Sequence, residues 1–199
     1  MSQNRFGATI KAIEYHLPKT CEDNDMLSVE NPEWRMDDIF SKTGIKKRWI
    51  SGENETSVDL AYFAAKKVID KFDAEKIDTL LYVTQSPDYF LPSSSCILQD
   101  RLSLPSNIKS FDINLGCSGY MYGLSIASAY IESGLSENVL LVCSDTYTKY
   151  ILPNDRTNRP IFSDAASATL VSKSVPKNIG YFSFGTNGSG FDKLIVKEG

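Results

Sequence analysis

One cysteine stands where a strand pattern gives way to a helix pattern. Cys117 follows the apolar run IKSFDINLG and precedes the small-residue pattern of 118–133. A thiol attacks a carbonyl carbon as the thiolate, and the unpaired N–H groups and dipole at a helix N-terminus favour that anion. The same N–H groups could hold the oxyanion of a tetrahedral intermediate. Free cysteines are usually buried, so two interpretations stay open: a nucleophile, or a small residue packed at a turn.

The glycines around this cysteine do not separate the two interpretations. Gly116 and Gly119 would let a substrate approach the backbone closely. Together with Gly123 they would equally let the helix pack tightly against a neighbour.

The remaining thiols and the single histidine offer less chemistry. Cys143 lies inside the apolar run NVLLVCSD and Cys96 lies within a helix pattern, so we expect both to be packed. Cys21 falls in a loop pattern. No C-x-x-C occurs and His16 has no second histidine to join it, so we predict no metal site and no disulfide framework.

Polar residues near strand ends have mainly structural explanations. Asp112, Asp145 and Asp164 occupy such positions, where aspartate commonly accepts hydrogen bonds from backbone N–H groups. The basic stretches KTGIKKRW and NDRTNRP could bind phosphate or could be solvated faces. No G-x-G-x-x-G or Walker pattern is present, so neither a nicotinamide nor an ATP site is indicated.

Composition is that of an ordinary globular protein. The 199 residues are 42% apolar and carry a net charge of −4, which gives no general basic surface for nucleic acid. No apolar run is long enough for a membrane span, and the first residues lack a signal-peptide core. We therefore expect a cytoplasmic protein with no membrane partner.

Strand and helix patterns alternate along the chain. A short helix is predicted within 31–44, ended by Gly44, and further helices at 57–72, 94–102 and 118–133. Strands are predicted at 8–18, 78–86, 108–116, 138–145, 166–174 and 179–186. The apolar face of the second helix would include Leu60, Phe63 and Val68. Such alternation favours an α/β fold with a largely parallel sheet, in which sites lie beyond the carboxyl ends of the strands. The Cys117 turn falls at such an end.

These pieces together resemble the N-terminal half of a β-ketoacyl-acyl-carrier-protein synthase III, of the thiolase superfamily. The matching segments span nearly the whole chain in family order, and the two most specific are FDINLGCSGYMYGLSIA and DRTNRPIFSDAASATLV. The resemblance implies one N-terminal thiolase-like domain over 1–199, with a mixed, mostly parallel five-stranded sheet and helices on both faces. It also implies a homodimer and a role in fatty acid biosynthesis.

The resemblance assigns roles to particular positions. Cys117 would take an acyl group from acyl-CoA as a thioester, its own N–H helping to form the oxyanion hole, and a malonyl-carrier-protein would then decarboxylate and attack. Arg156 matches a residue that contacts the CoA adenine, and Lys42 stands in place of a nearby family arginine. Phe162 would line the acyl pocket, and Leu91 would close the pocket of the partner subunit. No cofactor is implied beyond these substrates.

Some positions depart from the family pattern. Asp38 stands where the family has the tryptophan that stacks on adenine, which weakens the case for ordinary CoA binding and makes a carrier-bound primer an alternative. Trp34, one helical turn earlier, could substitute if the helix is shifted. The family's GDGAGA is SDAASA here, which keeps Asp164.

The family's catalytic histidine and asparagine belong to a C-terminal half that this sequence does not contain, and His16 does not match that histidine. We therefore expect the chain alone to be incomplete for condensation. A 3-hydroxy-3-methylglutaryl-CoA synthase would carry a glutamate where Gln85 stands, and an amide cannot do that acid–base work. A thiolase-fold acyltransferase of a specialised pathway, or a non-catalytic fragment acting in dimerisation, stays open.

Overall fold

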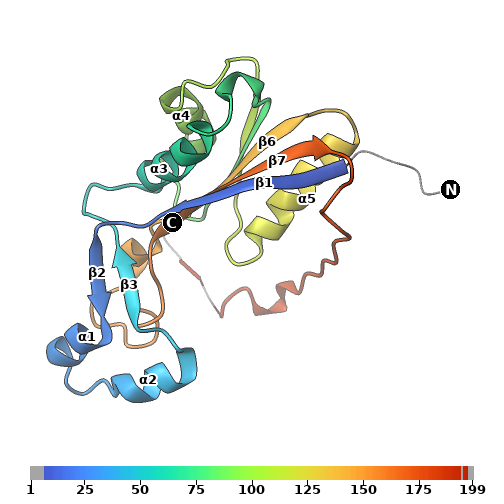
Figure 1. Ribbon diagram of the computed structural model, residues 1–199. Helices are drawn as coiled ribbons and strands as arrows, with labels where there is room; N and C mark the ends of the chain where they lie inside the picture. The colour runs from blue at the N-terminus through green and yellow to red at the C-terminus, as the bar shows by residue number, and fades with distance from the viewer. Residues whose placement is uncertain (1–6, 194, 197–199) are drawn as a thin grey trace.

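The larger lobe of the protein is built on a five-stranded sheet. The computed structural model describes residues 7–193 and 195–196, and Figure 1 shows the sheet above a smaller lobe. The sheet order is β1-β7-β6-β4-β5, formed by β1 (Gly7–His16), β4 (Thr79–Val83), β5 (Lys109–Ile113), β6 (Asn138–Asp145) and β7 (Ala165–Ser174).

Strand direction places several loops at one edge of this sheet. β4 pairs in parallel with both β5 and β6, whereas β7 is antiparallel to β6 and to β1. β1, β4, β5 and β6 therefore run in one direction and only β7 opposes them. The predicted mixed, mostly parallel five-stranded sheet is confirmed. The segments that follow β4, β5 and β6 leave from the same edge, as parallel pairing requires.

Helices cover both faces, as predicted. Leu80 and Tyr82 of β4 point into a core formed with α3 (Ser57–Ile69) and α4 (Ser94–Arg101). Leu81 and Val83 point the other way, into a core formed with α5 (Gly119–Glu132). This alternation follows from the period of two residues in a strand.

The buried face of α3 differs from the expected one. The helix begins at a capping box between Thr56 and Asp59. Leu60 and Val68 are fully buried as predicted, but Phe63 is 46% exposed and its ring lies 4.8 Å from that of His16. Small residues fill the contact instead, namely Ala61, Ala64 and Ala65, because they let the helix approach the sheet closely.

A small lobe has its own apolar cluster. It comprises β2 (Thr20–Asp23), α1 (Asn24–Glu30), α2 (Met36–Thr43) and β3 (Lys47–Ile50), and Gly44 ends α2 in a left-handed conformation, as expected. Leu27, Trp34 and Met36 form the cluster. Trp34 is only 5% exposed, so the hypothesis that its indole stacks on a nucleotide is wrong.

The segment predicted as a strand at 179–186 is not one, which corrects that prediction. It lies along α5 in Figure 1, where Phe184 stacks on Tyr122 at 4.4 Å between ring centroids. Phe182 stacks on Phe184, and Ile179 is buried in the α5 core. Ile179 is thus buried against α5 and the rings of Phe182 and Phe184 pack near it, whereas Tyr181 is fully exposed. Short 3-10 turns occur at Ala74–Lys76, Tyr147–Tyr150 and Gly188–Gly190.

Within the described residues, no helix combines the length and the apolar character needed to cross a bilayer.

Candidate active site

Cys117 lies in the turn between β5 and α5, two residues before the first residue of that helix. Its side chain is exposed. The Gly119 N–H donates to the carbonyl of Gly116 at 2.8 Å and closes the turn, while Ser118, at the N-cap, makes no side-chain capping hydrogen bond. Cys117 is therefore an exposed residue in this structure and not a member of either sheet core.

The glycines of this region have separable roles. A Cβ on Gly119 would lie 2.3 Å from Val83 Cγ1, and one on Gly123 would lie 2.5 Å from Leu141 Cδ1. These two glycines therefore let α5 lie close to β4 and β6, which is the packing alternative. A Cβ on Gly116 would instead lie 2.3 Å from Gln85 Oε1, so the Gln85 side chain rests against the backbone next to Cys117.

Sequence reasoning did not place Gln85 near the thiol. The signal that could have found it is topological: Gln85 follows β4 and Cys117 follows β5, and parallel neighbours end at one edge of a sheet.

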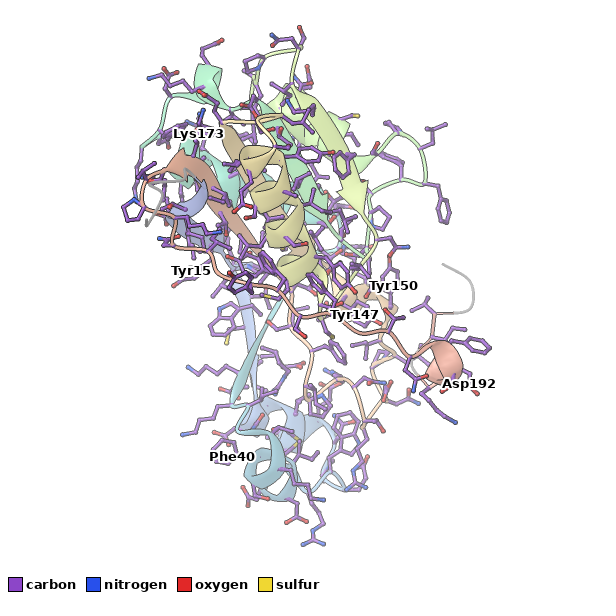
Figure 2. The ribbon with its side chains drawn as sticks, turned by 90° about the vertical axis from the view of Figure 1, so that its right-hand side faces the viewer. Tyr15, Phe40, Tyr147, Tyr150, Lys173 and Asp192 are labelled. Atoms are coloured by element: carbon purple, nitrogen blue, oxygen red, sulfur yellow. The ribbon has the colours of Figure 1, made fainter. Side chains whose placement is uncertain are left out.

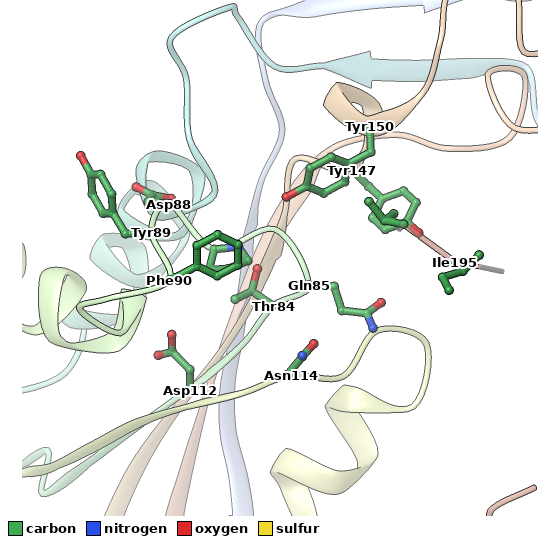
Figure 3. Close-up of a pocket in the computed structure, with 12 residues that line it drawn as sticks. Thr84, Gln85, Asp88, Tyr89, Phe90, Asp112, Asn114, Tyr147, Tyr150 and Ile195 are labelled. Carbon is green, nitrogen blue, oxygen red and sulfur yellow. The ribbon is translucent and has the colours of Figure 1, made fainter. Parts of the chain in front are cut away.

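A cavity of about 750 Å³ opens beside this turn (Figure 3). Gln85 and Asn114 lie on one side of it, and Tyr147 and Tyr150 lie across from Asp112 and Asn114. Figure 2 shows the two tyrosines together at the end of the large lobe that faces the small lobe. The lining mixes aromatic rings with hydroxyl, amide and carboxylate groups, and consists of Thr84, Gln85, Pro87, Asp88, Tyr89, Phe90, Asp112, Asn114, Tyr147, Tyr150, Ile195 and Val196.

The two residues expected at the acyl pocket lie near this cavity without lining it. Phe162 is half-buried and stacks on Tyr147, with ring centroids 4.9 Å apart. Leu91 is 86% exposed on the loop that also carries Tyr89 and Phe90, both of which line the cavity. Their roles in acyl binding stay predictions.

Asp145 fixes the turn that carries Gln85. Its Oδ1 accepts hydrogen bonds from the N–H of Gln85 at 2.7 Å, from the N–H and hydroxyl of Ser86 at 3.0 and 2.9 Å, and from the Thr84 hydroxyl at 3.0 Å. Burial raises the pKa of Asp145 above its ordinary value, although these hydrogen bonds act in the opposite direction.

The other two strand-end aspartates also hold loops. Asp112 accepts from the first two backbone N–H groups of α4, at 2.7 and 2.8 Å. Asp164 is fully buried and accepts from the N–H and hydroxyl groups of both Ser51 and Thr148, at 2.6 to 2.9 Å. The prediction that these carboxylates cap backbone groups is confirmed.

The residues expected to bind CoA are exposed and lie apart from the two sheet cores. Lys42 is on α2 of the small lobe, and Arg156 is on the loop 152–163 that precedes β7. Asp38, which replaces the family tryptophan, forms an ion pair with Arg35 at 2.8 Å on the exposed face of α2.

The other thiols differ from expectation in one case. Cys143 is largely buried, which raises its pKa to about 12, as expected of a packed thiol. Cys96 is exposed on α4, so the expectation that it is packed is wrong. Cys21 belongs to β2 rather than to a loop. Among the described residues no cluster of three or more histidine, cysteine or acidic side chains is arranged to hold a metal.

Comparison with known proteins shows which proteins this chain is similar to. The family model of 3-oxoacyl-[acyl-carrier-protein] synthase III matches residues 111–188, which include Cys117, Arg156 and Phe162. A putative 3-oxoacyl-[acyl-carrier-protein] synthase 3 of Campylobacter jejuni is 39% identical over 197 residues, covering 96% of this chain and 55% of the relative. A β-ketoacyl-[acyl-carrier-protein] synthase III of Clostridioides difficile is 35% identical, with 96% and 58% covered.

Solved structures that are similar to this chain carry the same enzyme name as these relatives. A crystal structure of a 3-oxoacyl-(acyl-carrier-protein) synthase III superposes with a TM-score of 0.91 at 44% identity, covering 96% of this chain and 58% of that one. The enzyme of the same name from Pseudomonas aeruginosa gives a TM-score of 0.87 at 30% identity, with 96% and 60% covered. The chain thus spans somewhat more than half the length of the relatives it matches. Over nearly its whole length, this chain resembles the 3-oxoacyl-acyl-carrier-protein synthase III family in both sequence and thiolase-like fold, as its motifs predicted.

Proposed function

We propose that this chain forms the acyl-accepting part of a 3-oxoacyl-acyl-carrier-protein synthase III, with Cys117 as the nucleophile. The Cys117 thiolate would attack the carbonyl carbon of acyl-CoA, and the carbon–sulfur bond to CoA would break. The CoA thiolate would leave and take up a proton, and the acyl group would remain as a thioester on Cys117. Malonyl-carrier-protein would then lose CO₂ and attack this thioester.

The exposure of Cys117 at the start of α5 carries this proposal. Backbone N–H groups of the first helical turn have no partner within the helix, so they could stabilise both the thiolate and the oxyanion. The cavity lined by Gln85 and Asn114 could give an acyl group room near the Cys117 turn, because the Gln85 side chain rests against Gly116. The match of the family model to this segment supports the same assignment.

Substrate and partner roles follow from the same proposal. Arg156 and Lys42 would bind the CoA nucleotide, Phe162 would shape the acyl pocket, and a second copy would bring Leu91 to that pocket in a homodimer. The exposure of Leu91 and Phe90 on one loop supports such a contact, because large apolar side chains exposed together favour a protein interface. A Leu91→Asp change should then shift sedimentation toward the monomer.

Intact mass spectrometry tests the first step. The folded chain is incubated with acyl-CoA and weighed, and we expect one acyl adduct that maps to Cys117. Cys117→Ser should remain unmodified, whereas Cys96→Ser, which changes another exposed thiol, should be acylated like the original chain. Absence of an adduct on the folded protein with a free thiol would refute the acyl-enzyme step and favour a non-catalytic role.

Condensation needs a separate test. The resemblance assigns decarboxylation to a histidine and an asparagine outside this sequence, so we expect the acylated chain alone to release no malonyl-dependent product. A longer family chain that contains this segment and those two residues should release it. If that longer chain is acylated but gives product only with an alcohol or amine acceptor, the specialised acyltransferase replaces the synthase.

A further inference from the structure

Two arginines of the loop 152–163 look equivalent in the sequence NDRTNRP, but the structure separates them. Arg156 is exposed. The side chain of Arg159 is only 18% exposed and donates to both carboxylate oxygens of Glu30, at 2.9 and 2.7 Å. It also donates to Glu22 Oε1 at 2.7 Å and to the carbonyl of Pro153 at 2.7 Å. These bonds occupy both terminal nitrogens of its guanidinium group.

Glu22 and Glu30 belong to the small lobe, so Arg159 joins the loop to that lobe. A bidentate hydrogen-bonded pair of a guanidinium and a carboxylate fixes the orientation of the two groups as well as the distance between them. The bond to the Pro153 carbonyl closes the loop on itself, and Arg156 lies between its two ends. The hydrogen bonds from Arg159 lower the pKa of Glu30, so its carboxylate stays ionised to a lower pH than that of an isolated glutamate.

Arg48 of β3 fastens the same loop from inside the small lobe. Its side chain is fully buried, and its Nη1 donates to the carbonyl of Pro160 at 3.1 Å and to Asn24 Oδ1 at 2.8 Å. Arg48 Nε also lies 3.5 Å from Glu22 Oε2. Glu22 therefore stands between two arginines, one from its own lobe and one from the loop.

We propose that Arg159 is a positioning residue, which holds the loop 152–163 on the small lobe so that Arg156 meets the nucleotide of CoA. This inference rests on the proposed function, because it assumes that Arg156 binds that nucleotide. Arg159 itself does not contact the ligand, since its terminal nitrogens are bonded within the protein. Losing it would free the loop and lower the fraction of molecules in which Arg156 is in place.

Two thioesters distinguish positioning from a general structural role. The concentration dependence of Cys117 acylation is measured with acyl-CoA and with the same acyl group on N-acetylcysteamine, which lacks the nucleotide. For Arg159→Ala we expect about a tenfold higher half-saturating concentration of acyl-CoA, with an unchanged saturating rate, equivalent to the loss of one good ionic contact. The short thioester should react with Arg159→Ala as it does with the original chain. Arg156→Ala should give the same pattern, namely a higher half-saturating concentration of acyl-CoA and an unchanged reaction with the short thioester.

Milder variants keep the test valid if Arg159→Ala folds poorly. Arg159→Lys keeps the charge but loses the bidentate geometry, and Glu30→Gln changes an exposed partner. Both should raise the half-saturating concentration of acyl-CoA by less than Arg159→Ala does. Arg101→Ala is the matched control, because Arg101 forms a comparable 2.8 Å ion pair with Asp59 on the large lobe. It should leave both thioesters unaffected.

Each outcome has a distinct meaning. A strong effect of Arg156→Ala with none for Arg159→Ala overturns the positioning role and leaves the CoA contact intact. A slower reaction of Arg159→Ala with the short thioester shows that the residue is merely structural. If Arg156→Ala changes nothing, the CoA contact and the positioning role both fail. Calorimetric titration with CoA gives the same comparison without acylation, and a chain that binds no CoA refutes both.

Discussion

Asp145 makes an unusual set of contacts that can be tested by two substitutions. Every hydrogen bond found for this side chain in the described part of the structure ends on Oδ1, and four donors converge there. An asparagine could place its single carbonyl oxygen at the same point and keep all four. An alanine keeps none. Asp145→Asn and Asp145→Ala should therefore differ sharply, although both remove the charge.

The expected loss in the free energy of unfolding follows from the number of hydrogen bonds lost. At a net 0.5–1.5 kcal/mol for each hydrogen bond, Asp145→Ala should lower the free energy of unfolding by about 2 to 6 kcal/mol. Asp145→Asn should stay within about 1 kcal/mol of the original chain, because it preserves the acceptor and removes a partly buried charge. Its NH₂ group can reach water in a cavity of about 350 Å³ that Asp145 also lines.

The pH dependence has a defined sign. Burial raises the pKa of Asp145 in the folded protein above its value of 3.8 in the unfolded chain, so the folded protein holds this proton more tightly. The resulting stabilisation is complete below the unfolded-state pKa and is lost as pH rises through the folded-state pKa. Asp145→Asn has no such proton, so its stability relative to the original chain should rise as pH rises across that window.

Urea unfolding of the three proteins at several pH values measures both effects. Acylation of Cys117 adds a functional readout, because Asp145 holds the turn whose Gln85 side chain rests against Gly116. We expect slower acylation for Asp145→Ala and a nearly normal rate for Asp145→Asn. Equal destabilisation by the two substitutions would refute the reasoning, since the charge and not the acceptor position would then be what the fold requires.

Two further predictions concern packing and thiol reactivity. Gly119→Ala should lower the free energy of unfolding by about 1 to 3 kcal/mol, because its Cβ would meet Val83 at 2.3 Å, whereas Gly134→Ala meets no neighbour and pays only for its left-handed backbone. Equal urea midpoints for original and Gly119→Ala proteins would contradict this. Iodoacetamide at neutral pH should label Cys117 and spare Cys143, whose pKa is raised to about 12 by burial. Peptide mapping measures the labelling of each cysteine. Labelling of Cys143 as fast as that of Cys117 would contradict the prediction and would show that β6 opens readily.

Local structure could be predicted wherever neighbouring residues decide it. The helix that became α3 begins at a capping box and α2 ends at Gly44, and both signals lie within one helical turn of the boundary they set. The position of Cys117 between a strand and a helix is equally local. That the strand-end aspartates accept from backbone N–H groups could be expected from residue type, but their partners could not, because Asp145 bonds to Gln85 sixty residues away and Asp164 to Ser51 113 residues away.

Side-chain exposure could not be predicted in the same way. Phe63 and Trp34 are both large and apolar, yet Phe63 is 46% exposed and Trp34 is buried. The difference depends on which element lies opposite each residue. The segment 179–186 has the composition of a strand, but α5 offers its rings a closer apolar surface than a sheet edge would.

Residue types in order along the chain were enough to predict the main helices and strands of the large lobe, the position of the thiol and the family resemblance. The sequence by itself could not distinguish Arg156 from Arg159, which are three residues apart and of one type. Only the tertiary structure separates them, since Glu22 and Glu30, the partners of Arg159, lie 137 and 129 residues away. Ion pairs and close packing act between atoms a few ångströms apart, and folding alone brings distant residues within that range.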